Sequence, residues 1–205
     1  MQTIKKRDKA ASKQALLDAA IAVFSERGYD AATTKEVAKR AGVSEALITR
    51  YFEGKKGLLL EIVKSFSQEM PEDTPASLPW TKDLKEELKQ LFAFHCRQHE
   101  TNAAFMKVVL SRAIVDPELG KQVGAIVHNR KLPVLQTRLR HYLENSDPSQ
   151  SEAIEALAFA VSSLSFSLGF MAPEVMSLET EKLHQITDQL CELLAKGMSH
   201  KVLKI

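Results

Sequence analysis

Glycine, proline and cysteine are scarce in this sequence of 205 residues. Eight glycines and seven prolines are too few for the many tight turns of an all-β sandwich. Two cysteines, Cys96 and Cys191, cannot build a disulfide framework, so we expect free thiols in a cytoplasmic protein. No apolar run approaches the length of a membrane span, and no apolar stretch follows the basic start at residues 1–7. Neither a membrane anchor nor a secretory signal is therefore expected.

Alanine, leucine, glutamate, lysine and glutamine are abundant, and all of them favour helix. Apolar residues recur with a helical period in one segment after another, and no segment shows strand alternation. We expect the first few residues to be a mobile arm, residues 70–79 with their three prolines to be a loop, and Pro133 to kink a helix. The pattern predicts an all-α fold of about nine helices, near residues 16–27, 33–40, 44–53, 55–68, 80–99, 102–114, 117–144, 149–171 and 178–202.

Charge divides unevenly along the chain, although the whole sequence carries only +2. Residues 1–56 hold 12 Lys and Arg against 7 Asp and Glu, a net charge of +5. Residues 57–205 hold 16 against 19, a net charge of −3. A basic N-terminal quarter indicates a polyanionic partner, and a solvated basic tail is the alternative.

Residues 34–54 have the pattern of a helix-turn-helix, in which two short helices cross at a steep angle. Ala38 is small at the expected crossing, and Gly42 can take the positive φ that the turn needs. Thr33 and Glu36 have the spacing of a capping box at the start of the first helix, and Ser44 can cap the second. The residues predicted to fill the wedge between the two helices are Val37, Ala41, Val43 and Ile48.

The second helix would expose Glu45, Ala46, Thr49 and Arg50, with Tyr51 at the edge. Such a face enters the DNA major groove, where Arg50 could read guanine or hold a phosphate. Thr34, Lys35 and Ser44 would lie at helix N-termini, which suit phosphate, and Lys55 would open the next helix on the same side. A helical hairpin with solvated charges is the alternative interpretation.

The stretch from about residue 13 to residue 62 resembles the N-terminal domain of the TetR/AcrR family of bacterial transcriptional regulators. The resemblance rests on Ala19-Ala20, Phe24, Gly28-Tyr29, Thr33-Thr34, Val37-Ala38, Ala41-Gly42-Val43-Ser44, Tyr51-Phe52, Lys55 and Leu58-Leu59. It implies a homodimer with a DNA-binding domain at 1–56 and an effector-binding and dimerisation domain at 57–205. It also implies operator release by a small molecule and DNA contacts from Thr34, Lys35, Ser44, Glu45, Ala46, Thr49, Arg50, Tyr51 and Lys55.

The sequence departs from that family at three positions. Position 49, commonly tyrosine, is Thr49, and position 53, often proline, is Glu53. Position 45, often lysine or polar, is Glu45, which could accept from a cytosine amine or interact favourably with the helix N-terminus. We favour the second role for Glu45, and no operator sequence is inferred.

Two apolar seams near the C-terminus recur at alternating spacings of three and four, which suits nearly parallel helix packing. In a helical regulator they would pair across a twofold axis as a four-helix bundle, a use that the family resemblance also implies. Packing inside one subunit is the alternative. The predicted dimer residues are Ile154, Leu157, Val161, Leu164, Leu168, Leu183, Ile186, Leu190 and Leu193.

A second stripe on the same helix would face a largely apolar effector pocket or the subunit core. The proposed ligand contacts are Phe92, His95, Phe105, Met106, Val109, Val127, Phe159, Ser163 and Phe166. Ordinary core packing is the alternative for each of them.

No catalytic, phosphate-loop or dinucleotide motif is present, and Glu86-Glu87 is expected to lie on a solvated face. His95, Cys96 and His99 share one helix, but zinc needs three or four ligands and no second cluster follows, so we predict no metal and no cofactor. The leading hypothesis is a cytoplasmic, homodimeric, ligand-responsive repressor and not an enzyme. A constitutive DNA-binding protein without an effector, and a helical enzyme or metal protein using these three residues, are the alternatives.

Overall fold

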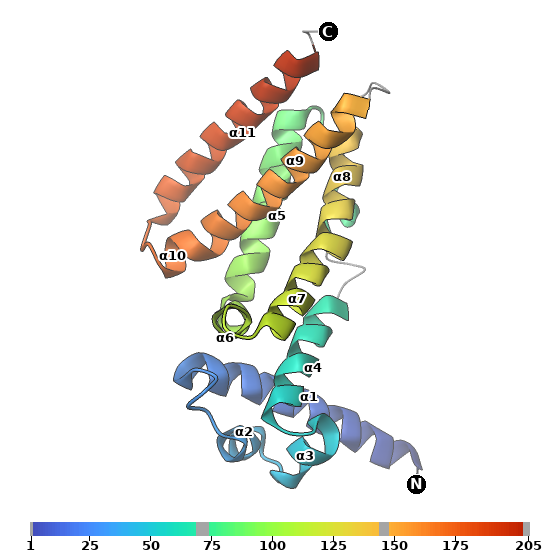
Figure 1. The fold of residues 1–205 in the computed structure, drawn as a ribbon, viewed down its shortest axis with the longest axis vertical. Coiled ribbons are helices and arrows are strands. Elements are labelled where there is room, and N and C mark those ends of the chain that lie inside the picture. The colour runs from blue at the N-terminus through green and yellow to red at the C-terminus, as the bar shows by residue number, and fades with distance from the viewer. Residues whose placement is uncertain (1, 69–73, 144–147, 203–205) are drawn as a thin grey trace. The chain divides into compact units, whose positions relative to one another are not determined.

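The computed structural model describes residues 2–68, 74–143 and 148–202, and Figure 1 shows them as helices joined by short connections. Of these residues 82% are helical, and no strand occurs among them, which confirms the predicted all-α class. The elements are α1 (Gln2–Arg27), α2 (Thr34–Ala41), α3 (Ala46–Phe52), α4 (Lys55–Gln68), η1 (Pro75–Ser77), α5 (Leu84–Thr101), α6 (Ala103–Ala113), α7 (Pro117–Ile126), η2 (Val127–Lys131), α8 (Leu132–Arg140), α9 (Pro148–Phe166), η3 (Ser167–Met171), α10 (Ala172–Glu174) and α11 (Thr180–Val202).

The helices form two compact units, residues 1–69 with 104–124, and residues 70–103 with 125–205. The first unit contains α1–α4, most of α6 and the beginning of α7. The expected boundary after residue 56 lies inside it, directly after the second residue of α4. Helix α1 begins at Gln2, well before the apolar period that starts at Leu16.

The first unit has its own core, built where the apolar faces of α1, α2, α3 and α4 meet. Leu16, Ala20 and Phe24 of α1 are buried, which confirms the helical period read there. Gly57 lets α4 approach the end of α3, because a Cβ at this position would lie 1.6 Å from the carbonyl oxygen of Phe52. No side chain fits there, so Gly57 fixes how α4 leaves the helix-turn-helix.

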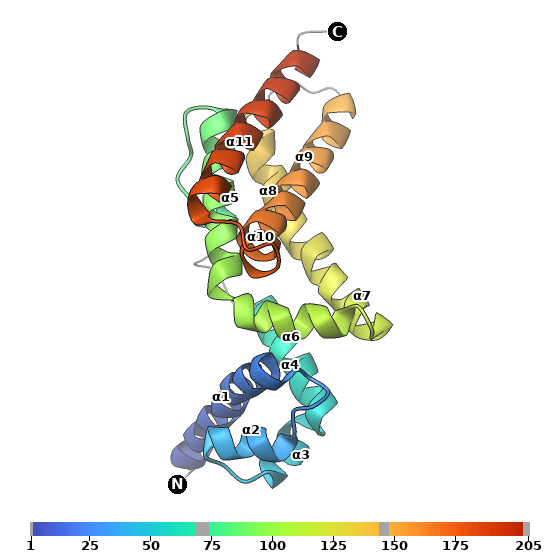
Figure 2. The ribbon, with the colours of Figure 1, turned by 90° about the vertical axis from the view of Figure 1, so that its left-hand side faces the viewer.

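The second unit is a bundle in which α5, α8, α9 and α11 run side by side (Figure 2). Helix α5 packs on α9, α11 and η3, and α8 packs on α9. Gly169 brings η3 close to α5, since a Cβ there would lie 2.6 Å from the Cα of Cys96. The core residues of this unit are Leu88, Leu91, Phe92, Leu132, Leu135, Leu139, Leu143, Ile154, Leu157, Ala158, Val161, Leu168 and Cys191.

Two π-helical turns interrupt the bundle helices, η2 before α8 and η3 before α10. Each ends two residues before a proline, Pro133 or Pro173. Proline has no N–H to donate and its ring crowds the carbonyl one turn earlier, so the hydrogen-bond ladder widens there. The distortion predicted at Pro133 is therefore a π-turn centred on residues 127–131.

A buried ion pair lies at the C-terminal end of α8. Arg138 donates through Nε to Glu87 at 2.5 Å, and the two side chains are 2% and 0% exposed. The guanidinium also donates to the carbonyls of Pro75, Leu78 and Pro79, and Tyr142 donates to Glu87 at 2.9 Å. The expectation that Glu87 is solvated was wrong, because its cationic partner comes from a helix 51 residues further along.

Residues Ser151–Glu174 form a helical stretch that is long and apolar enough to cross a membrane by length and composition alone. The statement that no apolar run reaches that length was therefore wrong. Ile154, Leu157 and Val161 of this stretch are buried in the core of the second unit. Core helices pass the same test, so the apolar composition has an explanation within the bundle.

Candidate nucleic-acid interface and effector site

The helix-turn-helix begins with a complete capping box. The Thr33 hydroxyl accepts from the Glu36 backbone N–H at 3.2 Å, and the Glu36 carboxylate accepts from the Thr33 N–H at 2.9 Å. These hydrogen bonds hold the pKa of Glu36 below its usual value. Two helix N–H groups are satisfied reciprocally, so the start of α2 is fixed as the sequence predicted.

Helix α2 ends where the chain must turn. Gly42 has φ +68° and ψ +28°, the left-handed conformation that the sequence predicted for it. Its N–H and that of Val43 return to carbonyls of the last turn of α2. Val37, Ala38 and Ile48 are buried between the helices, whereas Ala41 and Val43 are half-buried.

Helix α3 begins at Ala46, with Glu45 at the N-cap position and no side-chain cap. The prediction that the Ser44 hydroxyl caps it was wrong; the Ser44 carbonyl accepts from Leu47 instead. The Glu45 carboxylate accepts a hydrogen bond from the Thr34 hydroxyl at 2.6 Å. This bond joins the first residue of α2 to the start of α3, a contact that spacing in the sequence did not reveal.

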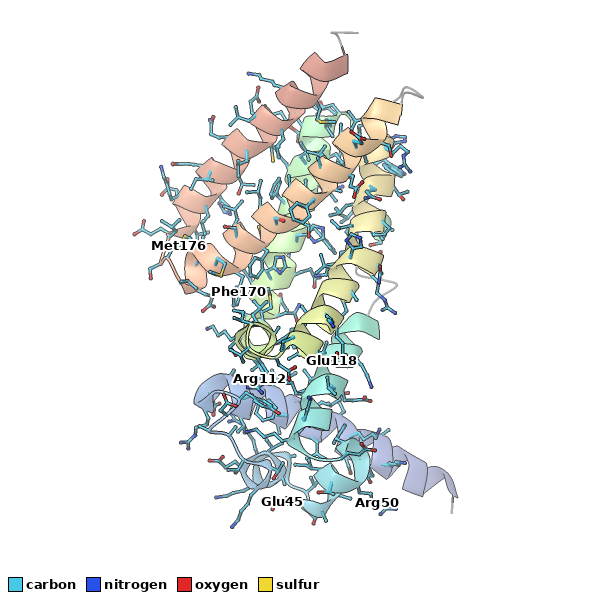
Figure 3. The ribbon with its side chains drawn as sticks, viewed as in Figure 1. Glu45, Arg50, Arg112, Glu118, Phe170 and Met176 are labelled. Carbon is cyan, nitrogen blue, oxygen red and sulfur yellow. The ribbon has the colours of Figure 1, made fainter. Side chains whose placement is uncertain are left out.

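The surface that the sequence predicted to contact DNA is largely exposed. Figure 3 shows Glu45 and Arg50 on the outer side of the first unit. Lys35, Ser44, Glu45, Ala46, Thr49 and Arg50 are exposed, while Thr34, Tyr51 and Lys55 are half-buried. Lysines of α1 join this face, because the ammonium groups of Lys9 and Lys13 lie 5.6 and 6.0 Å from the centre of the Tyr51 ring. Cation–π contacts of this length extend the basic surface to α1, which sequence reasoning had not connected with Tyr51.

Lys55 turns toward the protein. Its ammonium donates to the Asp30 carbonyl at 3.2 Å and lies 4.5 Å from the centre of the Tyr29 ring. Desolvation lowers the pKa of Lys55 from its ordinary value. An ammonium has three donors, so two remain after the contact with Asp30.

Helices α6 and α7 are tied to the same corner of the first unit. Arg112 lies 5.3 Å from the Tyr29 ring centre and 3.4 Å from the Asp30 carboxylate. Lys56 pairs with Asp116 at 3.7 Å, and Asp116 also accepts from the N–H groups of Glu118 and Leu119. Asp116 therefore caps α7, and these contacts hold its pKa below its usual value.

The predicted effector residues are distributed over both units. Phe105, Met106 and Val109 lie on α6 in the first unit, and Val109 is buried. The remaining residues lie in the second unit: Phe92 and His95 are buried, Val127 and Phe166 are half-buried, and Phe159 and Ser163 are exposed.

The histidines of α5 are held neutral. Burial lowers the pKa of His95 to about 3 and that of His99 to about 4, and the charge of Lys131 adds to both shifts. Burial raises the pKa of Cys96 to about 11, so the thiol is neither a good nucleophile nor a ready metal ligand. Across the described ranges no three His, Cys, Asp or Glu side chains are grouped to hold a metal ion.

The predicted dimer residues fall into two groups. Ile154, Leu157, Val161 and Leu168 are buried in the core of their own unit, and Leu164 packs against it. On α11, Leu183, Ile186 and Leu190 are half-buried against the same core, whereas Leu193 is 64% exposed. The exposed large apolar side chain of α9 is Phe159, at 61%.

A capped helix, a glycine turn and an exposed second helix, in a chain that also contains a helical bundle, define a helix-turn-helix protein with an additional helical domain. A family model described as "Bacterial regulatory proteins, tetR family" matches residues 16–62. Residues 16–62 of the chain thus match the DNA-binding domain model of the tetR family of bacterial regulatory proteins.

Two bacterial proteins named as HTH-type transcriptional regulators are similar to part of this chain. The chain is 26% identical over 117 residues to the Bacillus subtilis protein named a probable HTH-type transcriptional regulator, YttP, covering 56% of each. It is 34% identical over 98 residues to the HTH-type transcriptional regulator BetI of Rhizobium meliloti, covering 46% of this chain and 48% of that protein. The chain thus spans about half the length of these relatives.

A solved structure is similar over nearly the whole chain. The transcriptional regulator FadR from Bacillus subtilis, crystallised in complex with stearoyl-CoA, matches with a TM-score of 0.61. The match covers 90% of this chain and 98% of that one, at 20% identity. At that identity the likeness establishes the fold of both units.

Proposed function

We propose that this chain is a DNA-binding transcriptional repressor that a small molecule releases from its operator. The observation that carries the proposal is the exposed face of α3, with Thr49 and Arg50 outward and Ile48 buried behind them. Helix α3 is short and held by α2 on one side and α4 on the other, so it can enter a major groove as a rigid reader. Arg50 would contact base edges, and Ala46 and Thr49 would meet thymine methyl groups.

Phosphate contacts would flank the reading helix. Thr34, Lys35 and Ser44 lie where α2 and α3 begin, and backbone N–H groups at helix starts suit phosphate oxygens. Tyr51 and Lys55 complete the proposed contacts beyond the end of α3, where the two unused donors of Lys55 are available to phosphate. Glu45 would act through Thr34, by orienting its hydroxyl.

The operator-binding form would be a homodimer on a partly palindromic site. Two copies of α3 must reach successive major grooves about 34 Å apart, which one chain cannot do. Phe159 and Leu193 support the proposal, because large apolar side chains on α9 and α11 remain exposed in a single chain. We assign the dimer contact to these exposed faces, with Leu183, Ile186 and Leu190 at its edge.

A largely apolar effector would bind within the helical bundle and reduce DNA affinity. The stearoyl-CoA bound to the Bacillus subtilis neighbour supports the idea that this fold accommodates such a ligand. Effector and operator would be coupled by one free energy, so DNA must weaken effector binding by the same factor as the effector weakens DNA binding. Helix α4, which follows the helix-turn-helix directly, would transmit the conformational change caused by effector binding. The protein would act in the cytoplasm as a regulator and not as an enzyme.

Recovery and sequencing of genomic fragments bound to the purified chain tests the proposal. A short inverted repeat with half-sites one helical turn apart is expected. Arg50→Ala should relax the preference at defined bases, while Lys35→Ala should weaken binding to all sequences alike. Lys121→Ala, an exposed lysine of α7, serves as the control. Recovery without a motif that disappears at moderate salt would overturn specific recognition.

A further inference from the structure

Two lysines on consecutive turns of α1 meet the C-terminal end of α3. The ammonium of Lys9 lies 5.6 Å from the centre of the Tyr51 ring, and that of Lys13 lies 6.0 Å from the centre of the same ring. Lys13 also lies 5.5 Å from the centre of the Phe52 ring. These are the distances of cation–π contacts, which hold an ammonium over an aromatic face without neutralising its charge.

The aromatic rings and the lysines are held from opposite sides by the core of the first unit. Phe52 is 5% exposed, and its ring meets that of Tyr51 edge-on at 6.3 Å between centres. Leu16, three residues after Lys13 on α1, is fully buried. The two ammonium groups therefore have defined positions beside α3, although Lys9 is exposed and Lys13 is half-buried.

The two lysines differ from several other cations of the first unit in having no described acidic partner. No carboxylate among the described side chains forms an ion pair with Lys9 or Lys13. Two positive charges without a protein partner, beside a helix proposed to read DNA, are suited to phosphate. The cations that do pair with a carboxylate in this unit are Arg27, Arg40, Lys56, Lys64 and Arg112.

The position of the lysines relative to α3 indicates which part of the DNA they would meet. Tyr51 directly follows Arg50 of the proposed reading face. When that face lies in a major groove, the sugar-phosphate backbone at the edge of the groove passes the ends of the helix. Lys9 and Lys13 are separated by about 6 Å along the axis of α1, so they can reach neighbouring phosphates of one strand.

We propose that Lys9 and Lys13 bind neighbouring phosphates of one DNA strand, and that the Tyr51 ring is a positioning group for both ammonium groups. This inference rests on the proposed function, since it adds α1 to the DNA-binding surface. Each ammonium has three N–H donors, which can be directed to phosphate oxygens while the ring holds the charge in place. The contacts would strengthen binding to every sequence alike, because phosphates carry no sequence information.

The salt dependence of binding to a short duplex of mixed sequence tests the phosphate contacts. Lys9→Gln/Lys13→Gln should reduce the slope of log association constant against log salt concentration by about 0.9 for each lysine in each bound chain. Lys121→Gln/Lys182→Gln removes two exposed lysines of α7 and α11, is matched in charge, and should keep the parent slope. Equal slopes for the two double variants would overturn the inference.

The parent protein gives a second measurement that does not depend on how the variants fold. Lysines are acetylated in the free chain and in the chain saturated with the duplex, and the modified positions are located by mass spectrometry. DNA should protect Lys9 and Lys13 and leave Lys121 and Lys182 as reactive as in the free chain. Unprotected Lys9 and Lys13 in the saturated complex would contradict the phosphate contacts.

A double-mutant cycle tests the positioning role of the Tyr51 ring. Tyr51→Phe keeps the aromatic face and Tyr51→Leu removes it, so the difference between these two variants reports on the ring and not on the hydroxyl. Tyr51→Leu should bind DNA several-fold more weakly than Tyr51→Phe in the parent, and the two should bind alike in the Lys9→Gln/Lys13→Gln background. The same difference in both backgrounds would show that the ring does not act through the lysines.

The duplex of mixed sequence separates this inference from the proposed function. An inverted repeat among the bound genomic fragments, with an unchanged slope for Lys9→Gln/Lys13→Gln, would overturn the α1 contacts and leave the proposed repressor intact. A reduced slope without any recovered motif would support the α1 contacts and overturn sequence-specific repression.

Discussion

The Thr34 hydroxyl donates to the Glu45 carboxylate at 2.6 Å, and this bond spans the two helices of the helix-turn-helix. Both residues belong to the proposed DNA face, so an acid lies where phosphates would approach. The hydrogen bond to Glu45 directs the Thr34 hydroxyl toward the protein. The same carboxylate therefore links the two helices and adds a negative charge to the proposed DNA-binding surface.

Replacing that acid should strengthen DNA binding. Glu45→Gln keeps an acceptor for Thr34 and removes one negative charge, so we expect the affinity for operator to rise several-fold at low salt. Titration of labelled operator at several salt concentrations measures it. Glu118→Gln, an exposed acid of α7, controls for the net charge of the chain. Weaker binding by Glu45→Gln would instead make Glu45 a base contact.

A charge on the exposed apolar faces should dissociate the dimer. Phe159→Glu and Leu193→Glu each place a carboxylate on a surface that pairing would bury, which costs several kcal/mol of association free energy. Sedimentation velocity should show a monomer for each variant and a dimer for the parent. Val115→Glu, on an equally exposed apolar residue of the first unit, should remain dimeric. A monomeric parent protein would refute the proposed dimer itself.

Acid should destabilise the fold through His95. Its pKa is about 3 when folded and 6.5 when unfolded, so the unfolded chain binds more protons below pH 6.5. The free energy of unfolding then falls as the pH drops from about 6.5 toward 3, by about 2 kcal/mol at pH 5. Urea unfolding at pH 7 and pH 5 should show a smaller loss for His95→Leu than for the parent. His184→Gln, exposed on α11, should behave as the parent, and parallel losses in all three proteins would exclude this role.

The buried ion pair should respond strongly to loss of one partner. Arg138→Met leaves the Glu87 carboxylate buried without its cation, and we expect unfolding to become easier by about 3–5 kcal/mol. The exposed Arg140→Met should change it by less than about 0.5 kcal/mol. Denaturant titration compares the two, and similar small losses would show that the buried pair contributes little to stability.

Local signals in the sequence predicted local structure well. The capping box of Thr33 and Glu36 and the left-handed turn at Gly42 depend on residues within one or two turns, and the structure has both. The first residue of α3 was harder to predict, because the cap position depends on which of two adjacent residues, Ser44 or Glu45, ends the turn.

Long-range partners could not be read from the sequence. Glu87 looks like a surface acid until α8 brings Arg138 against it. Periodicity likewise showed that Ile154, Leu157 and Val161 share one face of α9, but not whether that face meets its own subunit or another.

The pairing of Glu87 with Arg138 also constrains how this protein can diverge. Either residue alone is a liability in the interior, so the two positions can change only together or in a fixed order through a less stable ancestor. Among close homologues we expect an acid at 87 and an arginine at 138 to be inherited as one character. Lineages that lose both should carry apolar residues of similar volume in their place.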